Sequence, residues 1–148
     1  MDELFVKING KTHYLWHTVN HEGEVLECYV SQRRNKEAAL KFIKKALKHN
    51  GLPEVITTDR LTSYKAAFKE INIEERQQIG RHLNNRCENS HLPFHRRERA
   101  MQRFKSIITL QRFTHIQGQI YNHFNIERHL ISRQTYKQKR TTDLAFVV

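Results

Sequence analysis

The chain opens with the stretch DELFVKINGKTHYLWHT (residues 2–18), which decides how the fold begins. Apolar and polar side chains alternate along residues 4–8 and again along residues 11–18, a pattern typical of strands that bury one face. Asn9-Gly10 separates the two runs, and this dipeptide strongly favours a β-hairpin. A second turn at residues 21–23 leads into a third alternating run at residues 25–30. We therefore expect three antiparallel strands in a meander.

Helices and short strands are expected to alternate after this meander. Asn35 is a good N-cap and predicts a helix to about Asn50, which Gly51 and Pro53 end. We expect a strand at residues 54–59, a helix at about 62–71 and a short strand near 77–79. A basic helical stretch should begin near residue 84 and break or kink at Pro93. A longer helix is expected at about 109–124, with these side chains facing inward: Phe113, Ile116, Ile120 and Phe124.

This order predicts an α/β fold, a mixed sheet flanked by helices. The length of 148 residues suits one domain with a hydrophobic core. No apolar run approaches the roughly 20 residues that span a membrane. The chain begins without the basic and apolar regions of a secretory signal, and it has only two cysteines. We therefore expect a cytoplasmic protein with no membrane partner.

The positive charge is concentrated in the second half of the chain. The formal net charge is +11, and residues 96–140 contain eleven Lys or Arg and only two acidic residues. Such asymmetry favours a polyanionic partner, nucleic acid first. The plainer explanation is a solvated, solubilising surface.

Three carboxylates are placed where a phosphoryl-transfer site needs them. Asp2 begins the first strand, Asp59 ends the fourth, and Glu88 lies in the basic helical stretch. Hard divalent cations need few protein carboxylates, because phosphate oxygens complete their coordination. Each residue also has a plainer explanation: Asp59 can cap the next helix and Glu88 can pair with nearby arginines. These patterns alone indicate a basic α/β domain.

Four motifs make the indication more specific. They are MDELFVKINGK (residues 1–11), SQRRNKEAA (31–39), ITTDRLTSY (56–64) and LNNRCENSH (83–91), the last continued by RRER (96–99) and RFKS (103–106). Together they resemble, in the right order and over about residues 1–113, the catalytic domain of bacterial DDE-type insertion-sequence transposases. The resemblance is closest to the branch named after insertion sequence six.

The resemblance implies a ribonuclease-H-like fold with a catalytic core at residues 1–113 and a C-terminal helix and basic tail at 114–148. Asp2, Asp59 and Glu88 would be the catalytic, metal-binding residues, with two Mg²⁺ ions expected and Mn²⁺ able to substitute. The implied reaction is metal-dependent DNA strand cleavage and strand transfer. The partners would be element-end and target DNA and a second copy of the chain. The implied DNA contacts are Arg86, His91, Arg96, Arg97, Arg99, Arg103 and Lys105.

Family members carry a helix-turn-helix region before this domain, and here Met1 directly precedes Asp2. We therefore expect an N-terminally truncated transposase. The alternative is an inactive remnant that is at most a basic, non-enzymatic DNA-binding protein. Salt-dependent DNA binding without carboxylate-dependent cleavage would distinguish the remnant from the enzyme.

Two other kinds of site are weaker alternatives. Cys87, His91 and His95 are spaced four residues apart, so with His82 they could form a zinc site on a continuous helix, but Pro93 interrupts that geometry. Ser63 with a histidine could suggest a hydrolase, although no nucleophile-elbow pattern accompanies it.

Overall fold

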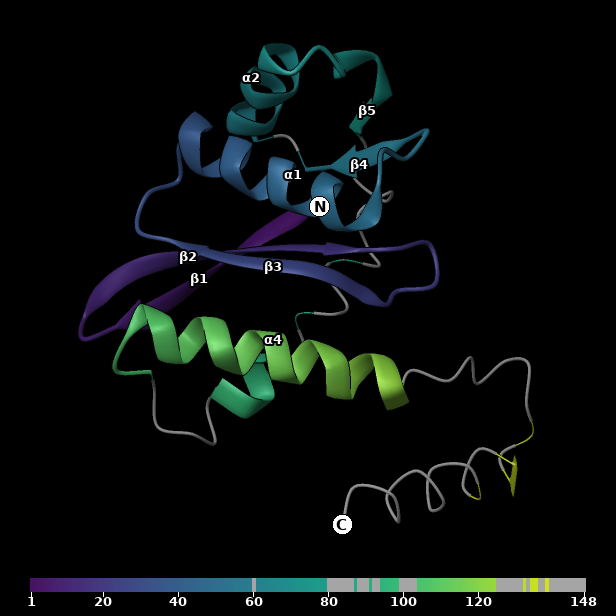
Figure 1. Ribbon diagram of the computed structural model, residues 1–148. Coiled ribbons are helices and arrows are strands. Elements are labelled where there is room, and N and C mark those ends of the chain that lie inside the picture. The colour runs from purple at the N-terminus through teal and green to yellow at the C-terminus, as the bar shows by residue number, and fades with distance from the viewer. Residues whose placement is uncertain are drawn as a thin grey trace.

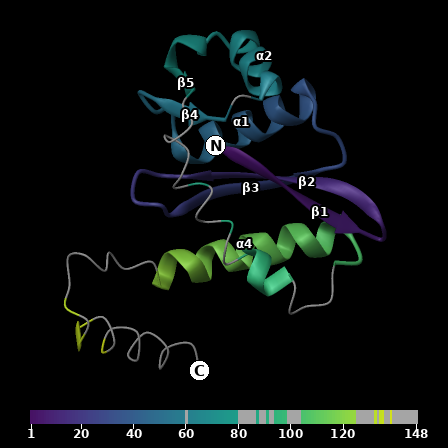
Figure 2. The same ribbon diagram turned by 180° about the vertical axis from the view of Figure 1, so that it is seen from behind.

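The computed structural model places a three-stranded sheet between two helical layers (Figures 1 and 2). It describes residues 1–59, 61–79, 87, 91, 94–98, 104–124, 132, 134, 135 and 138. Helices α1 (Lys36–Asn50) and α2 (Thr62–Glu70) lie on one side of the sheet, and α4 (Ile107–Phe124) lies on the other. The expected α/β architecture with flanking helices is therefore confirmed.

The meander forms as the alternating pattern predicts. β1 (Asp2–Ile8) pairs antiparallel with β2 (Lys11–Val19), which pairs antiparallel with β3 (Val25–Ser31). Asn9 and Gly10 both adopt positive φ, 49° and 79°. A two-residue turn with this backbone matches the twist of the flanking strands, which is why Asn-Gly fixes the hairpin here.

The first face of the sheet is covered by α1, which begins where the sequence predicts. The Asn35 side chain accepts a hydrogen bond from the Ala38 backbone N–H at 3.1 Å and so caps the helix. Trp16 on β2 is fully buried against Phe42 of α1 and meets Tyr64 of α2 edge-on, with ring centroids 5.6 Å apart. This aromatic cluster fixes both helices over the start of β1.

Two short parallel strands continue the chain beside β1. β4 (Ile56–Thr58) pairs with β5 (Gln77–Ile79), which follows the short 3₁₀ helix η1 (Glu74–Arg76). The N-terminal amine of Met1 donates to the Thr57 carbonyl at 2.6 Å. This contact places the start of β1 next to β4, and it brings the expected carboxylates of the two strands to one edge.

The opposite face is covered by α4, whose orientation differs from our prediction. Leu110 and Thr114 are buried, whereas Ile116 and Ile120 are about half exposed, at 55% and 50%. The prediction that these two isoleucines face inward is therefore wrong. A Cβ at Gly118 would lie 3.1 Å from Val25 Cγ1, so the absence of a side chain at Gly118 lets this face of α4, and not the face with the two isoleucines, pack against the sheet. Phe113 packs against the core as predicted, and the Phe124 side chain lies outside the described residues.

The boundary expected at residue 113 falls inside α4, which runs without a break from Ile107 to Phe124. Gln111 ties this helix to β3: its side chain accepts from the Val30 N–H at 2.8 Å and donates to the Cys28 carbonyl at 2.9 Å. Asn122 makes the same pair of bonds to the backbone of Val25. The part of α4 beyond residue 113 is thus tied to the sheet.

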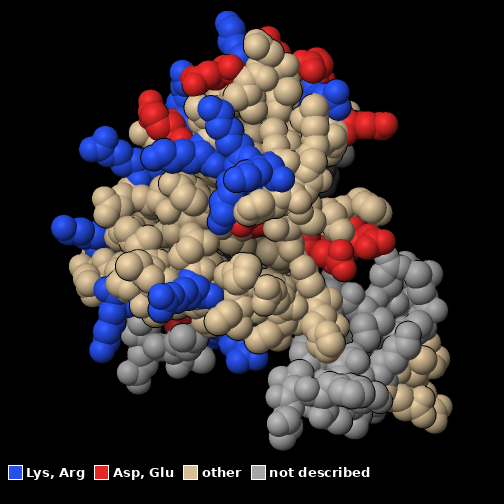
Figure 3. All heavy atoms as spheres, in the orientation of Figure 1, with Lys and Arg blue, Asp and Glu red and all other residues tan. Residues whose placement is uncertain are grey.

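Basic side chains gather over α1 on the face shown in Figure 3. Lys41, Lys44 and Lys48 are exposed there, on the side of the helix that faces away from the sheet. Among the described helices, none combines the length and the apolar character that a membrane crossing requires.

Candidate functional site

Three carboxylates meet where β1 begins and β4 ends. One oxygen from each of Asp2, Glu3 and Asp59 lies within 4.8 Å of the other two. Asp2 and Glu3 are the first residues of β1, and Asp59 follows β4 directly. The Met1–Thr57 hydrogen bond holds these two strands together at this point. The structure therefore brings together two of the three predicted catalytic carboxylates and adds a third that was not predicted.

Glu3 is the most buried of the three. One of its oxygens forms an ion pair with Arg34, while Oε2 is buried without a hydrogen-bond partner among the described residues. Burial and the neighbouring Asp59 charge raise the pKa of Glu3 to about 7, although Arg34 acts in the opposite direction. A carboxylate that is costly to ionise beside two others is a place where a cation would be stabilised.

Asp59 accepts a hydrogen bond from the Leu61 backbone N–H at 3.1 Å through Oδ1. The N-cap residue of α2 is Leu61, so Asp59 orients the start of the helix without capping it. Asp2 accepts from the Glu3 N–H at 2.9 Å through Oδ1. These bonds fix one oxygen of each aspartate and orient the carboxyl groups. The three carboxylates are hard oxygen donors, and the buried Glu3 Oε2 has no hydrogen-bond partner among the described residues. This set of donors suits a divalent cation such as Mg²⁺.

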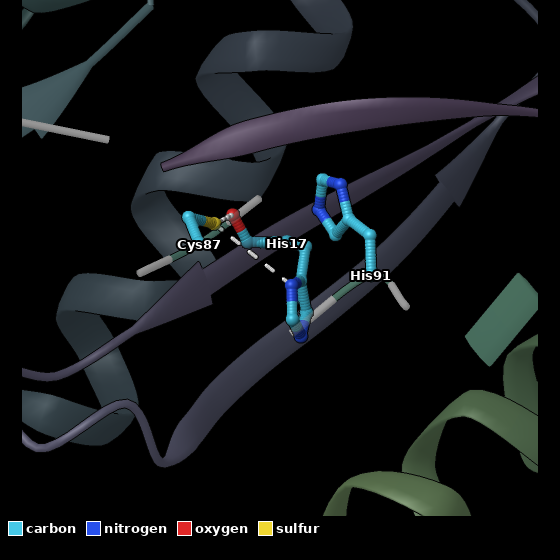
Figure 4. Close-up of side chains that lie close together, drawn as sticks. All are labelled: His17, Cys87 and His91. Atoms are coloured by element: carbon cyan, nitrogen blue, oxygen red, sulfur yellow. Dashed lines mark hydrogen bonds between the residues drawn. The ribbon is translucent and has the colours of Figure 1, made fainter. Parts of the chain in front are cut away.

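A second cluster adjoins the carboxylates through His91. His91 Nδ1 lies 4.0 Å from Asp2 Oδ2, and its ring centroid lies 5.3 Å from that of His17 on β2. Cys87 Sγ is 3.9 Å from His17 Nδ1, and Figure 4 shows these three side chains converging. Burial is the main cause that lowers the pKa of His17 to about 3 and that of His91 to about 4. Both rings are therefore neutral near pH 7.

The predicted DNA contacts fall in three places. Arg96 and Arg97 are exposed on the helical residues 94–98, whereas His91 is largely buried and faces Asp2. Lys105 lies at the other end of β1, where its carbonyl accepts from Asn9, roughly 20 Å from Asp2 at the usual strand rise. Glu88, Arg86, Arg99 and Arg103 lie outside the described residues, so their predicted roles stay predictions.

Sequence reasoning missed Glu3 and His17. Strand alternation places Glu3 on the face opposite Asp2, so nothing in the pattern suggests that both reach Asp59. His17 resembles any histidine of an alternating strand, and its proximity to Cys87 depends on tertiary structure. The zinc site considered from spacing also differs from the structure. His95, one of its candidate ligands, instead pairs with Glu98 at 3.3 Å, and His82 lies outside the described residues. The one signal for Glu3 is its position beside Asp2.

Comparison with known proteins agrees with this geometry. A family model described as a DDE domain matches residues 1–127. The chain belongs to the DDE transposase family, in the insertion-sequence-six branch. This DDE domain is 34% identical over 71 residues to the transposase for insertion sequence-like element IS431mec of Staphylococcus aureus. The same values hold for the S. aureus transposase of insertion sequence element IS257 in transposon Tn4003.

The DDE domain is also 36% identical over 74 residues to an uncharacterized protein, pYV0051, of Yersinia pseudotuberculosis, a match that covers 48% of this chain and 69% of that protein. The matches to the staphylococcal transposases cover 48% of this chain and 32% of each relative. The DDE domain thus spans about a third of those relatives. No solved structure matches it.

Proposed function

We propose that this DDE domain catalyses metal-dependent cleavage of a DNA strand and its transfer to target DNA. The observation that carries the proposal is the convergence of Asp2 and Asp59, from the start of β1 and the end of β4, to within 4.8 Å. Both residues lie at the places where the family motifs put the first two catalytic acids. Family membership gives a role in transposition, and DDE domains generally use divalent metals.

The three predicted acids, Asp2, Asp59 and Glu88, would hold two Mg²⁺ ions, and Mn²⁺ would substitute. When bound, such ions activate the attacking oxygen and stabilise the leaving oxygen of a phosphodiester. Asp2 and Asp59 each have one oxygen held by a backbone N–H, which restricts the rotation of both carboxyl groups. Glu3 supports the site: its carboxylate, costly to ionise where it is buried beside Asp59, would be stabilised in its charged form by a bound cation, and its bond to Arg34 anchors the start of β1.

We further propose that the fold is ribonuclease-H-like. In support, the strand order is β3-β2-β1, and the Met1–Thr57 hydrogen bond sets β1 beside β4, which pairs with β5 in parallel. Helices cover both faces of the three-stranded sheet (Figure 1). This arrangement places the acids of β1 and β4 at one edge, where ligand sites of open sheets form.

DNA would be bound by the basic residues that the motifs supply. Arg96 and Arg97 are exposed and close in sequence to His91, which contacts Asp2, so they are well placed for phosphates near the carboxylates. Lys105, at the far end of β1, would contact DNA away from the reacting phosphate. A homodimer of the full-length protein would align two element ends.

The test is cleavage of a duplex that carries the terminal inverted repeat of the element. The purified chain is incubated with Mg²⁺ or Mn²⁺, and nicked strands are resolved on a denaturing gel. Asp2→Asn and Asp59→Asn each remove one charge without removing volume. We expect both to abolish nicking while DNA affinity survives or rises, since less negative charge faces the phosphates. Glu54→Gln, an exposed carboxylate just before β4, is the matched control and should cut normally.

Metal binding gives a second readout that does not need activity. Mn²⁺ binding, followed by electron paramagnetic resonance, should weaken in both aspartate variants and stay unchanged in Glu54→Gln. Nicking that survives Asp59→Asn would overturn the assignment of the site. An absence of nicking in every variant, with salt-dependent and sequence-independent DNA binding, would instead identify the chain as an inactive remnant.

A further inference from the structure

A compact set of softer metal ligands lies next to the carboxylates. His17 of β2 and the helical residues Cys87 and His91 each offer one donor atom, and these three atoms lie within 4.8 Å of one another. Figure 4 shows the two imidazoles and the thiol pointing into a common space. We propose that His17, Cys87 and His91 bind one Zn²⁺ ion at a site separate from the carboxylates.

The distances suit this ion. A tetrahedral zinc site with one sulfur and two nitrogen ligands places its donor atoms about 3.3–3.6 Å apart. Cys87 Sγ and His17 Nδ1 are 3.9 Å apart, and the His91 donor atom lies within 4.8 Å of both, so shifts of no more than roughly 1–1.5 Å bring the three donors to this geometry. One thiolate and two neutral imidazoles form a soft and borderline donor set, which selects zinc over magnesium. The carboxylate cluster has the opposite preference.

The three donor residues lie in buried or largely buried surroundings. Cys87 and His17 are buried, and His91 Nε2 is buried with no hydrogen-bond partner among the described residues. Such an orphaned buried nitrogen is costly unless something binds it. A cavity of about 30 Å³, lined in part by His17 and His91, has room for one water beside the two imidazoles.

A hydrogen bond alone explains only part of this arrangement. The Cys87 thiol donates to the His17 carbonyl at 3.5 Å, which accounts for the position of the sulfur. It does not account for the two imidazoles beside that sulfur, whose ring centroids are 5.3 Å apart, or for the buried His91 nitrogen without a hydrogen-bond partner among the described residues. On zinc binding the thiol loses its proton to solvent, a Zn–S bond replaces the S–H bond, and no electron is transferred.

The zinc ion would act as a structural clamp. It would join the end of β2 to the segment that contains Cys87 and His91, and His91 lies 4.0 Å from Asp2. The same segment contains Glu88, the predicted third acid, directly after Cys87 in the sequence. Zinc at this position would therefore order the chain on which the carboxylate site depends, without itself contacting DNA.

Cobalt substitution tests the proposal in the full chain. The protein is freed of metal with a chelator and titrated with Co²⁺, whose bond to a thiolate gives a charge-transfer band that oxygen ligands do not give. We expect one Co²⁺ per chain with this band, displaced by Zn²⁺. Cys87→Ser should abolish the band. His17→Gln and His91→Gln should each weaken Co²⁺ binding by more than the roughly 10–100-fold that loss of an outer-shell partner costs.

Matched controls exist for both residue types. Cys28→Ser removes the other buried thiol, and His13→Gln changes a second buried histidine of β2. Both variants should keep the band and the affinity for Co²⁺. A band that survives Cys87→Ser, or that is lost in Cys28→Ser, would overturn the assignment.

X-ray absorption at the zinc edge avoids the risk that a variant fails to fold. The zinc-loaded wild-type chain should show one sulfur at about 2.3 Å and two imidazole nitrogens at about 2.0–2.1 Å. A zinc ion with oxygen ligands alone, or an absence of stoichiometric zinc, would refute the site. Neither result depends on whether the chain cleaves DNA.

Discussion

Glu3 lies in β1 and Asp59 directly follows β4, yet one carboxylate oxygen of each lies within 4.8 Å of the other. Asp59 is the second largest contributor to the raised pKa of Glu3, after burial. Two acids forced together in this way cost stability whenever both are ionised. A bound cation would relieve this repulsion. The free energy of unfolding of the metal-free chain therefore measures how strongly the two carboxylates destabilise the fold.

The free energy of unfolding should therefore depend on pH through Glu3. Its pKa is about 7 in the folded chain and 4.5 in the unfolded chain, so the folded state binds its proton more tightly. This contribution is fully present below pH 4.5 and is lost as the pH rises to about 7. Its size is roughly 3 kcal/mol at the usual 1.36 kcal/mol for each pKa step. Urea denaturation with a chelator present, at several pH values, measures it.

Glu3→Gln is the necessary reference, because His17 and His91 contribute with the opposite sign. Their lowered pKa values give stability that is present above pH 6.5 and lost as the pH falls toward about 3 and 4, respectively. The difference in stability between the wild type and Glu3→Gln removes these histidines from the comparison. The free energy of unfolding of the wild type, relative to that of Glu3→Gln, should decrease as the pH rises from 4.5 to 7. A constant difference would contradict the raised pKa.

Loss of the α1 N-cap should destabilise the domain. Asn35→Ala leaves the Ala38 N–H without its acceptor and should lower the free energy of unfolding by about 1 kcal/mol. Asn35→Asp keeps an acceptor oxygen and should retain most of the stability. Equal stability of the alanine variant and the wild type in urea denaturation would show that the cap contributes nothing.

Local signals explain why the sequence predicted much of this fold. Asn9-Gly10 has backbone angles that select one hairpin turn, and Asn35 has a side chain that satisfies a helix terminus. Both effects involve residues close in sequence, so pattern reasoning finds them. The face of α4 depends instead on a distant partner, Val25, and on the one glycine that lets the helix approach it. An apolar stripe alone led to the wrong face.

The candidate site was also predictable only in part from local sequence patterns. Asp2 and Asp59 were predicted because each lies at a strand end within a motif. Glu3 joins them through a contact between β1 and β4 that no local pattern encodes. Likewise, His17 meets Cys87 although 70 positions separate them in the chain. Convergence of this kind depends on tertiary packing, which a single sequence does not display.

The contact between Gly118 and Val25 can be tested by a double-mutant cycle. A Cβ added at Gly118 would lie 3.1 Å from Val25 Cγ1, which is tighter than an ordinary contact. Replacement of a helical glycine by alanine normally stabilises by about 1 kcal/mol. We expect Gly118→Ala to stabilise the wild type by less than this, or to destabilise it. In a Val25→Ala background the full gain should appear, and equal effects in the two backgrounds would contradict the close packing.

Arg96 and Arg97 are exposed on the helical residues 94–98, a few positions after His91 in the sequence, and we expect both to contact DNA phosphates. Each phosphate contact that is lost should reduce the dependence of log affinity on log salt by about 1. The double variant Arg96→Gln/Arg97→Gln should therefore lower this slope by about 2 and weaken binding to all duplexes alike. Fluorescence anisotropy at several salt concentrations measures the slope.

Lys69→Gln is the control, since it removes one exposed positive charge from the last turn of α2, a helix to which no DNA contact is assigned. A general effect of net charge would act on both variants in proportion to the charge removed. If Arg96 and Arg97 contact phosphates and Lys69 does not, the slope of the Lys69 variant stays unchanged. An unchanged slope in the double arginine variant would place the DNA path elsewhere, with the exposed lysines of α1 as the next surface to neutralise.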